Sequence, residues 1–266
     1  MPILTFLSDF GMRDSYVAEM KAAALRIVPR ATVIDITHEI APQDVVAASV
    51  ILGRAIDAFP RGTIHVAVVD PGVGTDRRIL AVQIAGQIVL CPDNGLITWP
   101  WRTHLGVKAH AVHWHPRSRH GMTFDGRDRF APVAAMLCKG QPLSKLARPI
   151  DDPLLLDIAP TESNAGTIIH IDHFGNATTN FRADHIPPNA TVMIRRRLLG
   201  PIRKTYADVP IGQPLALIGS AGLLEIAIRN RSAGHRLRVK VGDPVYFLES
   251  EDIAKYAKRP RAPRKK

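Results

Sequence analysis

Residues 3–36 read ILTFLSDFGMRDSYVAEMKAAALRIVPRATVIDI, and this stretch predicts a strand, a helix and a second strand in succession. Ile3 to Leu7 is a short apolar run typical of a buried strand. Ser15 to Val28 places apolar residues on one helical face, and Pro29 ends that helix. Ala31 to Ile36 is rich in β-branched residues and predicts the second strand. A strand–helix–strand unit of this kind is typical of a parallel sheet.

The same alternation continues through the first half of the chain. Helical spacing returns over Asp44 to Phe59 and over Phe130 to Lys139. Further strands are expected at Ile64 to Val69, Ile79 to Ile84 and Gln87 to Leu90. We therefore predict an N-terminal α/β domain over residues 1–146 with a central, mainly parallel sheet.

The composition changes after residue 146. Residues 147–163 are acidic and interrupted by prolines, which predicts a linker. In residues 164–250, short apolar or alternating runs separated by glycine and proline predict a small C-terminal β-barrel. The strands are expected at Thr167 to Ile171, Thr191 to Arg195, Pro214 to Ile218, Leu223 to Ile228, Leu237 to Val241 and Val245 to Leu248. Residues 251–266 have the composition of a basic, disordered tail.

Composition and charge exclude several classes of protein. An apolar share of 46% and a charged share of 22% are typical of a globular chain. The apolar runs are too short for a membrane-spanning helix and no secretory leader is visible, so we expect a cytoplasmic protein. The net charge of +11 is concentrated in the stretch from Lys255 to Lys266 and in a cluster at Arg195 to Arg197. The tail is expected to be solvated and the cluster to lie on a hairpin surface, so no nucleic-acid partner is predicted.

Carboxylates follow several of the predicted strands. Asp9 and Asp14 come after the first strand, Asp70 follows the run that ends at Val69, and Asp93 follows another strand. Taken singly, Asp9, Asp14 and Asp93 are each explained by a turn or a helix cap. Ligands of open α/β sheets bind at the carboxyl ends of strands, so their joint placement favours a ligand site.

The sequence bears on other site chemistries as well. The glycines at 72 and 74 lack the third glycine of a dinucleotide fingerprint, and no Walker loop is present, so neither a nicotinamide nor a P-loop nucleotide site is predicted. A magnesium phosphoesterase that uses the carboxylates with His113, His115 and His120 remains an alternative. His120, five residues before Asp125 in the sequence, is a further candidate for a general base, and a plain surface position in a loop is the alternative.

Six motifs occur in an order that identifies a family resemblance. They are SDFGMRDSYVAEMK (8–21), VVDPGVGTDRR (68–78), PDNGL (92–96), TFDGRDRFAPVAA (123–135), IDHFGNATTN (171–180) and GSAGLLEIAI (219–228). The chain resembles the S-adenosylmethionine hydrolases, or SAM hydroxide adenosyltransferases, relatives of the bacterial fluorinase and chlorinase. The resemblance implies that water attacks C5′ of S-adenosylmethionine to give adenosine and L-methionine, with no metal or cofactor. It also implies a homotrimer with active sites between the N-domain of one subunit and the C-domain of its neighbour.

The resemblance further implies substrate-binding residues in both domains. Asp9 would hold the ribose hydroxyls and Asp14 would contact the methionine portion. A carboxylate suits a diol because it accepts two hydrogen bonds. The matching C-terminal positions are Asp172 and Ser220 near the amino-acid end, Phe174 and Asn176 beside adenine, and Ala233 in a loop, 230–233, whose backbone contacts the base.

The catalytic set implied by the resemblance is Asp70, Arg77 and Asp125. Hydrolases of the family carry Asp, Arg and His at these positions, and the halogenating relatives lack the first two, so water is favoured as the nucleophile. This chain reads TFDGRD where hydrolases read TFHGRD, which places Asp125 at the histidine position. Either carboxylate is able to act as the general base. A protein that binds an adenosyl ligand but turns it over poorly, because of Asp125, remains the second hypothesis.

Overall fold

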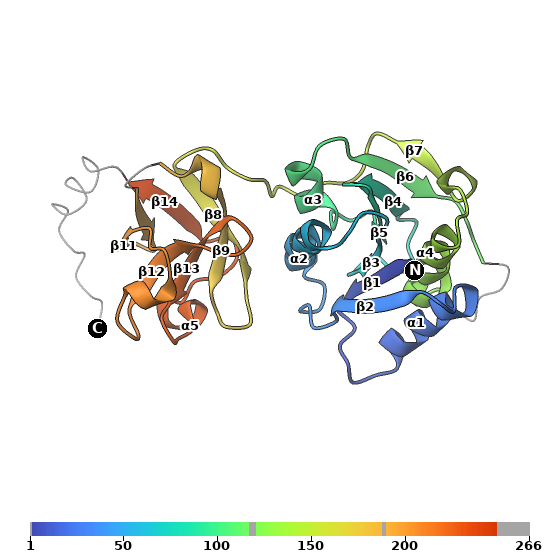
Figure 1. The fold of residues 1–266 in the computed structure, drawn as a ribbon, viewed down its shortest axis with the longest axis horizontal. Coiled ribbons are helices and arrows are strands. Elements are labelled where there is room, and N and C mark those ends of the chain that lie inside the picture. The colour runs from blue at the N-terminus through green and yellow to red at the C-terminus, as the bar shows by residue number, and fades with distance from the viewer. Residues whose placement is uncertain (1, 117–120, 188–189, 249–266) are drawn as a thin grey trace. The chain divides into compact units, whose positions relative to one another are not determined.

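The computed structural model describes residues 2–116, 121–187 and 190–248 (Figure 1). It divides the chain into two compact units, Met1–Ala159 and Pro160–Lys266. The predicted basic tail at 251–266 and His120 lie outside the described residues. No helix within the described ranges is long and apolar enough to cross a membrane.

Unit 1 is built on a mixed seven-stranded sheet of order β2-β1-β3-β5-β4-β6-β7. The strands are β1 (Ile3–Ser8), β2 (Thr32–Thr37), β3 (Ile64–Val68), β4 (Ile79–Ile84), β5 (Gln87–Pro92), β6 (Lys108–Val112) and β7 (Ala147–Ile150). Pairs among β2, β1, β3 and β5 are parallel, whereas β4, β6 and β7 pair antiparallel with their neighbours.

The expected mainly parallel sheet is therefore corrected to a mixed one. Ala85 and Gly86 form a two-residue turn with φ of 50° and 75° between β4 and β5, and such a turn joins only antiparallel strands. β6 and β7 were not predicted, and β7 adds a strand at the start of the stretch 147–163 that was assigned to a linker. A charged, histidine-containing strand such as β6 lacks the apolar signal that finds central strands.

Helices cover both faces of this sheet (Figure 1). On one face lie α1 (Tyr16–Ile27) and α4 (Ala131–Cys138); on the other lie α2 (Val45–Ala58) and α3 (Thr98–Thr103). The predicted apolar face of α1 is confirmed, because Val17, Met20 and Ala24 are buried. α2 begins at an Asp44 cap, whose Oδ1 accepts a 2.9 Å hydrogen bond from the Ala47 amide.

The carboxyl ends of the central strands β1 and β3 lie side by side at one edge of the sheet. β1 and β3 are parallel neighbours, and Ser8 at the end of β1 pairs with Val68 at the end of β3. Asp9 and Asp70 follow these ends and therefore emerge at the same edge of the sheet.

Unit 2 is a nearly closed, barrel-like antiparallel sheet of order β11-β10-β14-β8-β9-β13-β12. Its strands are β8 (Ala165–Ile171), β9 (Ala177–Arg182), β10 (Thr191–Ile194), β11 (Arg197–Pro201), β12 (Pro214–Ile218), β13 (Leu223–Ile228) and β14 (Pro244–Leu248). Val192, Leu224 and Ile226 are among its fully buried core residues. A bridge between Arg203 and Leu217 links the segment after β11 to β12 at the opposite edge.

Local turns explain two features of unit 2. Arg195 and Arg196, with φ of 46° and 62°, form the two-residue turn between β10 and β11, so the basic cluster lies on a hairpin as expected. The strand predicted at Leu237 to Val241 is wrong. Leu237 is the last residue of the short helix α5 (Ala233–Leu237), and residues 238–241 follow it outside any strand. The Ser232 cap of α5 accepts a 3.1 Å hydrogen bond from the His235 amide.

Candidate active site

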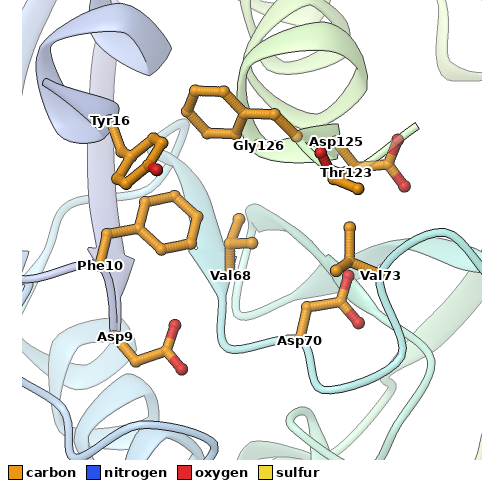
Figure 2. A pocket seen from close by; sticks show the side chains of 10 residues that line it. Asp9, Phe10, Tyr16, Val68, Asp70, Val73, Thr123, Asp125 and Gly126 are labelled. Carbon is orange, nitrogen blue, oxygen red and sulfur yellow. The ribbon is translucent and has the colours of Figure 1, made fainter. Parts of the chain in front are cut away.

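A pocket of about 320 Å³ opens at the carboxyl ends of β1 and β3 (Figure 2). Asp9, Asp70 and Asp125 lie at three positions around it, and Phe10 and Tyr16 point their rings toward it (Figure 2). The remaining lining residues are Val68, Val73, Thr123, Phe124 and Gly126. The pocket thus combines an aromatic wall with carboxylate groups.

Asp70, Arg77 and Asp125 form one connected cluster at this pocket. Arg77 Nε donates to Asp70 Oδ1 and Oδ2 at 2.9 and 2.8 Å, and Nη2 also donates to Asp70 Oδ2. The same Nη2 donates to Asp125 Oδ2 at 2.6 Å. The structure therefore brings together the three residues predicted as the catalytic set, with one guanidinium between two carboxylates.

The cluster is buried, so its charges are weakly screened. The side chains of Asp70, Arg77 and Asp125 are 4%, 9% and 4% exposed. Burial opposes the charged form of Arg77, but hydrogen bonds and charges from both carboxylates outweigh it and raise the pKa of Arg77. Arg77 Nη1 is buried and has no hydrogen-bond partner within the described part of the chain.

Two local structures bring distant residues to this cluster. After β3 the chain turns at once: the Val73 amide donates to the Asp70 carbonyl at 3.2 Å and the Gly72 amide to Asp70 Oδ1 at 3.2 Å. This turn folds Arg77 back onto Asp70. Asp125 stands directly before a π-helical turn, η1 (Gly126–Phe130), and helices of this kind are frequent at functional sites.

Gly126 allows the aromatic wall to approach the pocket closely. A Cβ at this position would lie 3.2 Å from the Phe124 ring and 3.3 Å from the Phe10 ring. Phe10, Tyr16 and Phe124 contact one another edge to face. Arg127 lies 4.9 Å above the Phe124 ring and joins η1 to α1 through a 2.9 Å bond to Glu19.

The other acidic residues predicted here have different fates. Asp9 lines the pocket, and its Oδ2 accepts a 2.8 Å hydrogen bond from the Gln43 amide. Asp14 is exposed and does not line the pocket. Asp93 is not part of the lining either, because its carboxylate holds Arg78 and the Leu154 amide at 2.6 and 2.7 Å.

In unit 2, three of the predicted binding residues share the turn between β8 and β9. Asp172 Oδ1 accepts from the Asn176 amide at 2.8 Å, and Asn176 Nδ2 donates to Asp172 Oδ2 at 3.2 Å. Phe174 is 75% exposed. The Gly234 amide, next to the buried Ala233, donates to the Gly175 carbonyl at 2.9 Å, so the loop at 230–233 lies against this turn.

Two polar residues beside these positions were missed from the sequence. Tyr206 donates a 2.5 Å hydrogen bond to Glu225, and Asn176 Nδ2 lies 3.5 Å from the Tyr206 hydroxyl. Burial, together with Glu225, raises the pKa of Tyr206. A Cβ added at Gly219, the neighbour of the exposed Ser220, would lie 2.9 Å from Glu225 Oε2, so Glu225 is close to this position as well. Glu225 falls inside the motif GSAGLLEIAI, which was the available signal.

The geometry gives no support to the magnesium alternative. His113 and His115 are exposed, and among the described residues no group of three or more His, Cys, Asp or Glu side chains is placed to hold a metal. The carboxylates of Asp70 and Asp125 bind a guanidinium instead.

Comparisons with known proteins agree with this architecture. Residues 4–147 match the SAM hydroxide adenosyltransferase N-terminal domain, and residues 166–246 match the C-terminal domain of the same family. A protein of Thermus thermophilus named (R)-S-adenosyl-L-methionine hydrolase is 41% identical, over 91% of this chain and 98% of the relative. A protein of Salinispora arenicola with the same name is 36% identical, over 91% and 96%. A fluorinase of Nocardia brasiliensis is 29% identical, over 91% and 97%.

Solved structures show the same fold. An uncharacterized conserved protein from Thermotoga maritima superposes with a TM-score of 0.84 at 34% identity, covering 92% of this chain and 100% of that one. A conserved hypothetical protein from Thermus thermophilus gives a TM-score of 0.81 at 39% identity, covering 93% and 100%. With both domain models matched in order, the chain belongs to the SAM hydroxide adenosyltransferase family.

Proposed function

We propose that this protein hydrolyses S-adenosylmethionine to adenosine and L-methionine. The observation that carries the proposal is the buried cluster of Asp70, Arg77 and Asp125 at a pocket in the unit that matches the family's N-terminal domain. Relatives that are 41% and 36% identical over most of the chain are named as hydrolases of this substrate. Asp9, Asp70 and Asp125 also give the pocket an acidic lining, which suits a sulfonium cation.

The chemistry asks little of the leaving group. The oxygen of water forms a bond to C5′ while the C5′–sulfur bond breaks. The electron pair of the broken bond goes to sulfur and gives the neutral thioether of methionine. The Asp70–Asp125 pair receives the proton that water loses, and Arg77 holds both carboxylates in place. General base help of this kind is worth about 10²- to 10⁴-fold, and the alignment of water with the breaking bond supplies the rest.

Substrate binding uses residues of both units in this proposal. Asp9 accepts hydrogen bonds from the ribose hydroxyls, and Asp14 contacts the methionine portion of the substrate. The residues from unit 2 are Asp172 and Ser220 near the amino-acid end, with Phe174, Asn176 and Ala233 at the base. The complete site forms between subunits of a homotrimer. Phe174 is 75% exposed, which leaves its ring accessible for stacking against the base.

A second function is favoured by one observation. Asp125 is already bound to Arg77, and the family resemblance implies a histidine at this position in the hydrolases. A protein that binds an adenosyl ligand with little turnover fits that difference. The cytoplasmic location and the independence from metals and cofactors expected from the sequence stay predictions.

One experiment separates these functions. The purified protein, treated with EDTA, is incubated with S-adenosylmethionine in halide-free buffer, and adenosine and methionine are followed by liquid chromatography. We expect equal amounts of both products, reduced by about 10²-fold or more in Asp70→Asn. Asp76→Asn is the matched control, because Asp76 is an exposed carboxylate in the same loop and is expected to keep full activity. Ligand binding without products would favour the second function. Products formed by the untreated protein but not by the EDTA-treated protein would favour a metal enzyme.

A further inference from the structure

A row of polar side chains beneath the pocket ends at the loop that carries Asp9. Ser8, the last residue of β1, is 0% exposed and His38, just after β2, is 3% exposed. Ser8 Oγ and His38 Nδ1 lie 2.7 Å apart. His38 Nε2 lies 3.1 Å from Asp35 Oδ1 in β2, and Lys21 of α1 donates to Asp35 Oδ2 at 2.5 Å. The row links the half-exposed Asp35 to the pocket end of β1.

Ser8 and Asp35, at the two ends of this row, make further contacts. The Phe10 amide donates to Ser8 Oγ at 3.3 Å, and Ser8 Oγ shares a hydrogen bond with His38 Nδ1 in which the donor depends on the histidine tautomer. His38 Nε2 faces Asp35, although this contact lacks hydrogen-bond geometry and Nε2 has no hydrogen-bond partner among the described residues. Burial opposes ionisation of Asp35, but Lys21 and His38 outweigh it and hold the pKa of Asp35 below its ordinary value.

His38 holds the same loop a second time through its backbone. Its carbonyl accepts a 2.8 Å hydrogen bond from the Gly11 amide. Asp9 and Phe10, which stand between the two anchors, both line the pocket. Ser8 and His38 are not part of the lining, so any effect on the substrate passes through the loop.

We propose that Ser8 and His38 are positioning residues that aim the Asp9 carboxylate at the ribose hydroxyls of the substrate. This inference rests on the proposed role of Asp9. Without the Ser8 hydroxyl, His38 Nδ1 loses its hydrogen-bond partner and the Phe10 amide loses its acceptor, so the loop gains freedom at the residue beside Asp9. Contacts to a ribose are made before and during the reaction alike, so their loosening raises KM more than it lowers kcat.

The chain offers a matched control in the same strand. Thr5 of β1 is also 0% exposed, and its hydroxyl lies 2.6 Å from Nδ1 of another buried histidine, His65. Neither residue lines the pocket. Thr5→Val removes the same kind of buried hydroxyl–imidazole bond without touching the loop at Asp9.

The test compares steady-state kinetics of the full-length variants with S-adenosylmethionine. We expect Ser8→Ala to raise KM about 10-fold with kcat within about 3-fold of wild type, and Ser8→Thr, which keeps the hydroxyl, to restore KM. Thr5→Val is expected to lower the melting temperature but to leave KM unchanged. Asp35→Asn, a change at a half-exposed position, is expected to raise KM about 3-fold and serves if Ser8→Ala does not fold.

Two results would overturn the inference. An unchanged KM in Ser8→Ala and Asp35→Asn, or an equal rise of KM in Thr5→Val, would show that the row only stabilises the fold. Asp9→Asn separates this failure from that of the proposed function. If Asp9→Asn raises KM while Ser8→Ala does not, only the positioning role is wrong; if Asp9→Asn leaves KM unchanged, the role of Asp9 itself is wrong.

Discussion

Arg77 Nη2 donates a 2.6 Å hydrogen bond to Asp125 Oδ2, across 48 residues of sequence. The same nitrogen also bonds Asp70, so one guanidinium holds a carboxylate from each of two loops. Arg129 Nη1 also lies 3.8 Å from Asp125 Oδ2. Asp125 is therefore integrated into the charge network of the site, at the position where the family resemblance implies a histidine in the hydrolases.

Removing Arg77 is expected to disable the site and destabilise unit 1. Arg77→Gln leaves two buried carboxylates without their shared cation, a change that costs about 3–5 kcal/mol in comparable buried pairs. Arg78→Gln is the matched control, because Arg78 is 36% exposed and pairs with Asp93 and Asp152. We expect Arg78→Gln to keep its activity with a smaller loss of stability, measured by urea unfolding beside product formation. Equal activity losses in both variants would contradict a special role for Arg77.

We expect hydrolysis of S-adenosylmethionine to survive the replacement of Asp125 by histidine. Asp125→His retains an acceptor for Arg77 in its neutral form, so we expect hydrolysis within about 10-fold of wild type. Asp125→Ala removes the acceptor and should lose about 100-fold or more. Initial rates of adenosine release measure both. A gain of more than about 100-fold in Asp125→His would instead indicate that the natural aspartate suppresses turnover.

Subunit mixing tests whether the site is shared between copies. Asp70→Asn in unit 1 and Asp172→Ala in unit 2 are each expected to be nearly inactive. If each site takes unit 1 from one copy and unit 2 from another, co-expression of the two variants in equal amounts restores about a quarter of the sites. Activity measured on the co-purified mixture checks this. A mixture as inactive as its parents would place the whole site within one chain.

Acid sensitivity of the fold is expected to depend on His65. Burial lowers the pKa of His65 below its ordinary value of 6.5, although the hydrogen bond to Gln87 opposes the shift. Just below pH 6.5, His65 is therefore protonated to a greater extent in the unfolded chain than in the folded chain. The stabilising contribution is fully present above pH 6.5 and is lost as the pH falls through the lower pKa of the folded state.

The corresponding measurement is urea unfolding from about pH 8 to about pH 5. Below pH 6.5, the free energy of unfolding of the wild type should fall by up to about 1.4 kcal/mol per pH unit more steeply than that of His65→Gln. Parallel curves for the two proteins would show that His65 titrates alike in the folded and unfolded chains.

The parts of the molecule that were predictable from sequence depend on local patterns. The spacing of Val17, Met20 and Ala24 fixes the buried face of α1 because a helix repeats every 3.6 residues. Asp70 and Arg77 lie within a single motif, and the tight turn between them makes their contact a local event. The hairpin at Arg195 and Arg196 is local as well.

The sequence by itself thus identified the family and predicted an α/β unit, a barrel-like unit and the three residues of the proposed catalytic set. Only the tertiary structure decided that the sheet is mixed, that Asp93 serves Arg78 rather than the pocket, and that Ser8 meets His38 behind Asp9. Tyr206 beside Asn176 is another such contact. These relationships join residues from separate elements, and hydrophobic periodicity reports which face of an element is buried without reporting which side chain of another element it will meet.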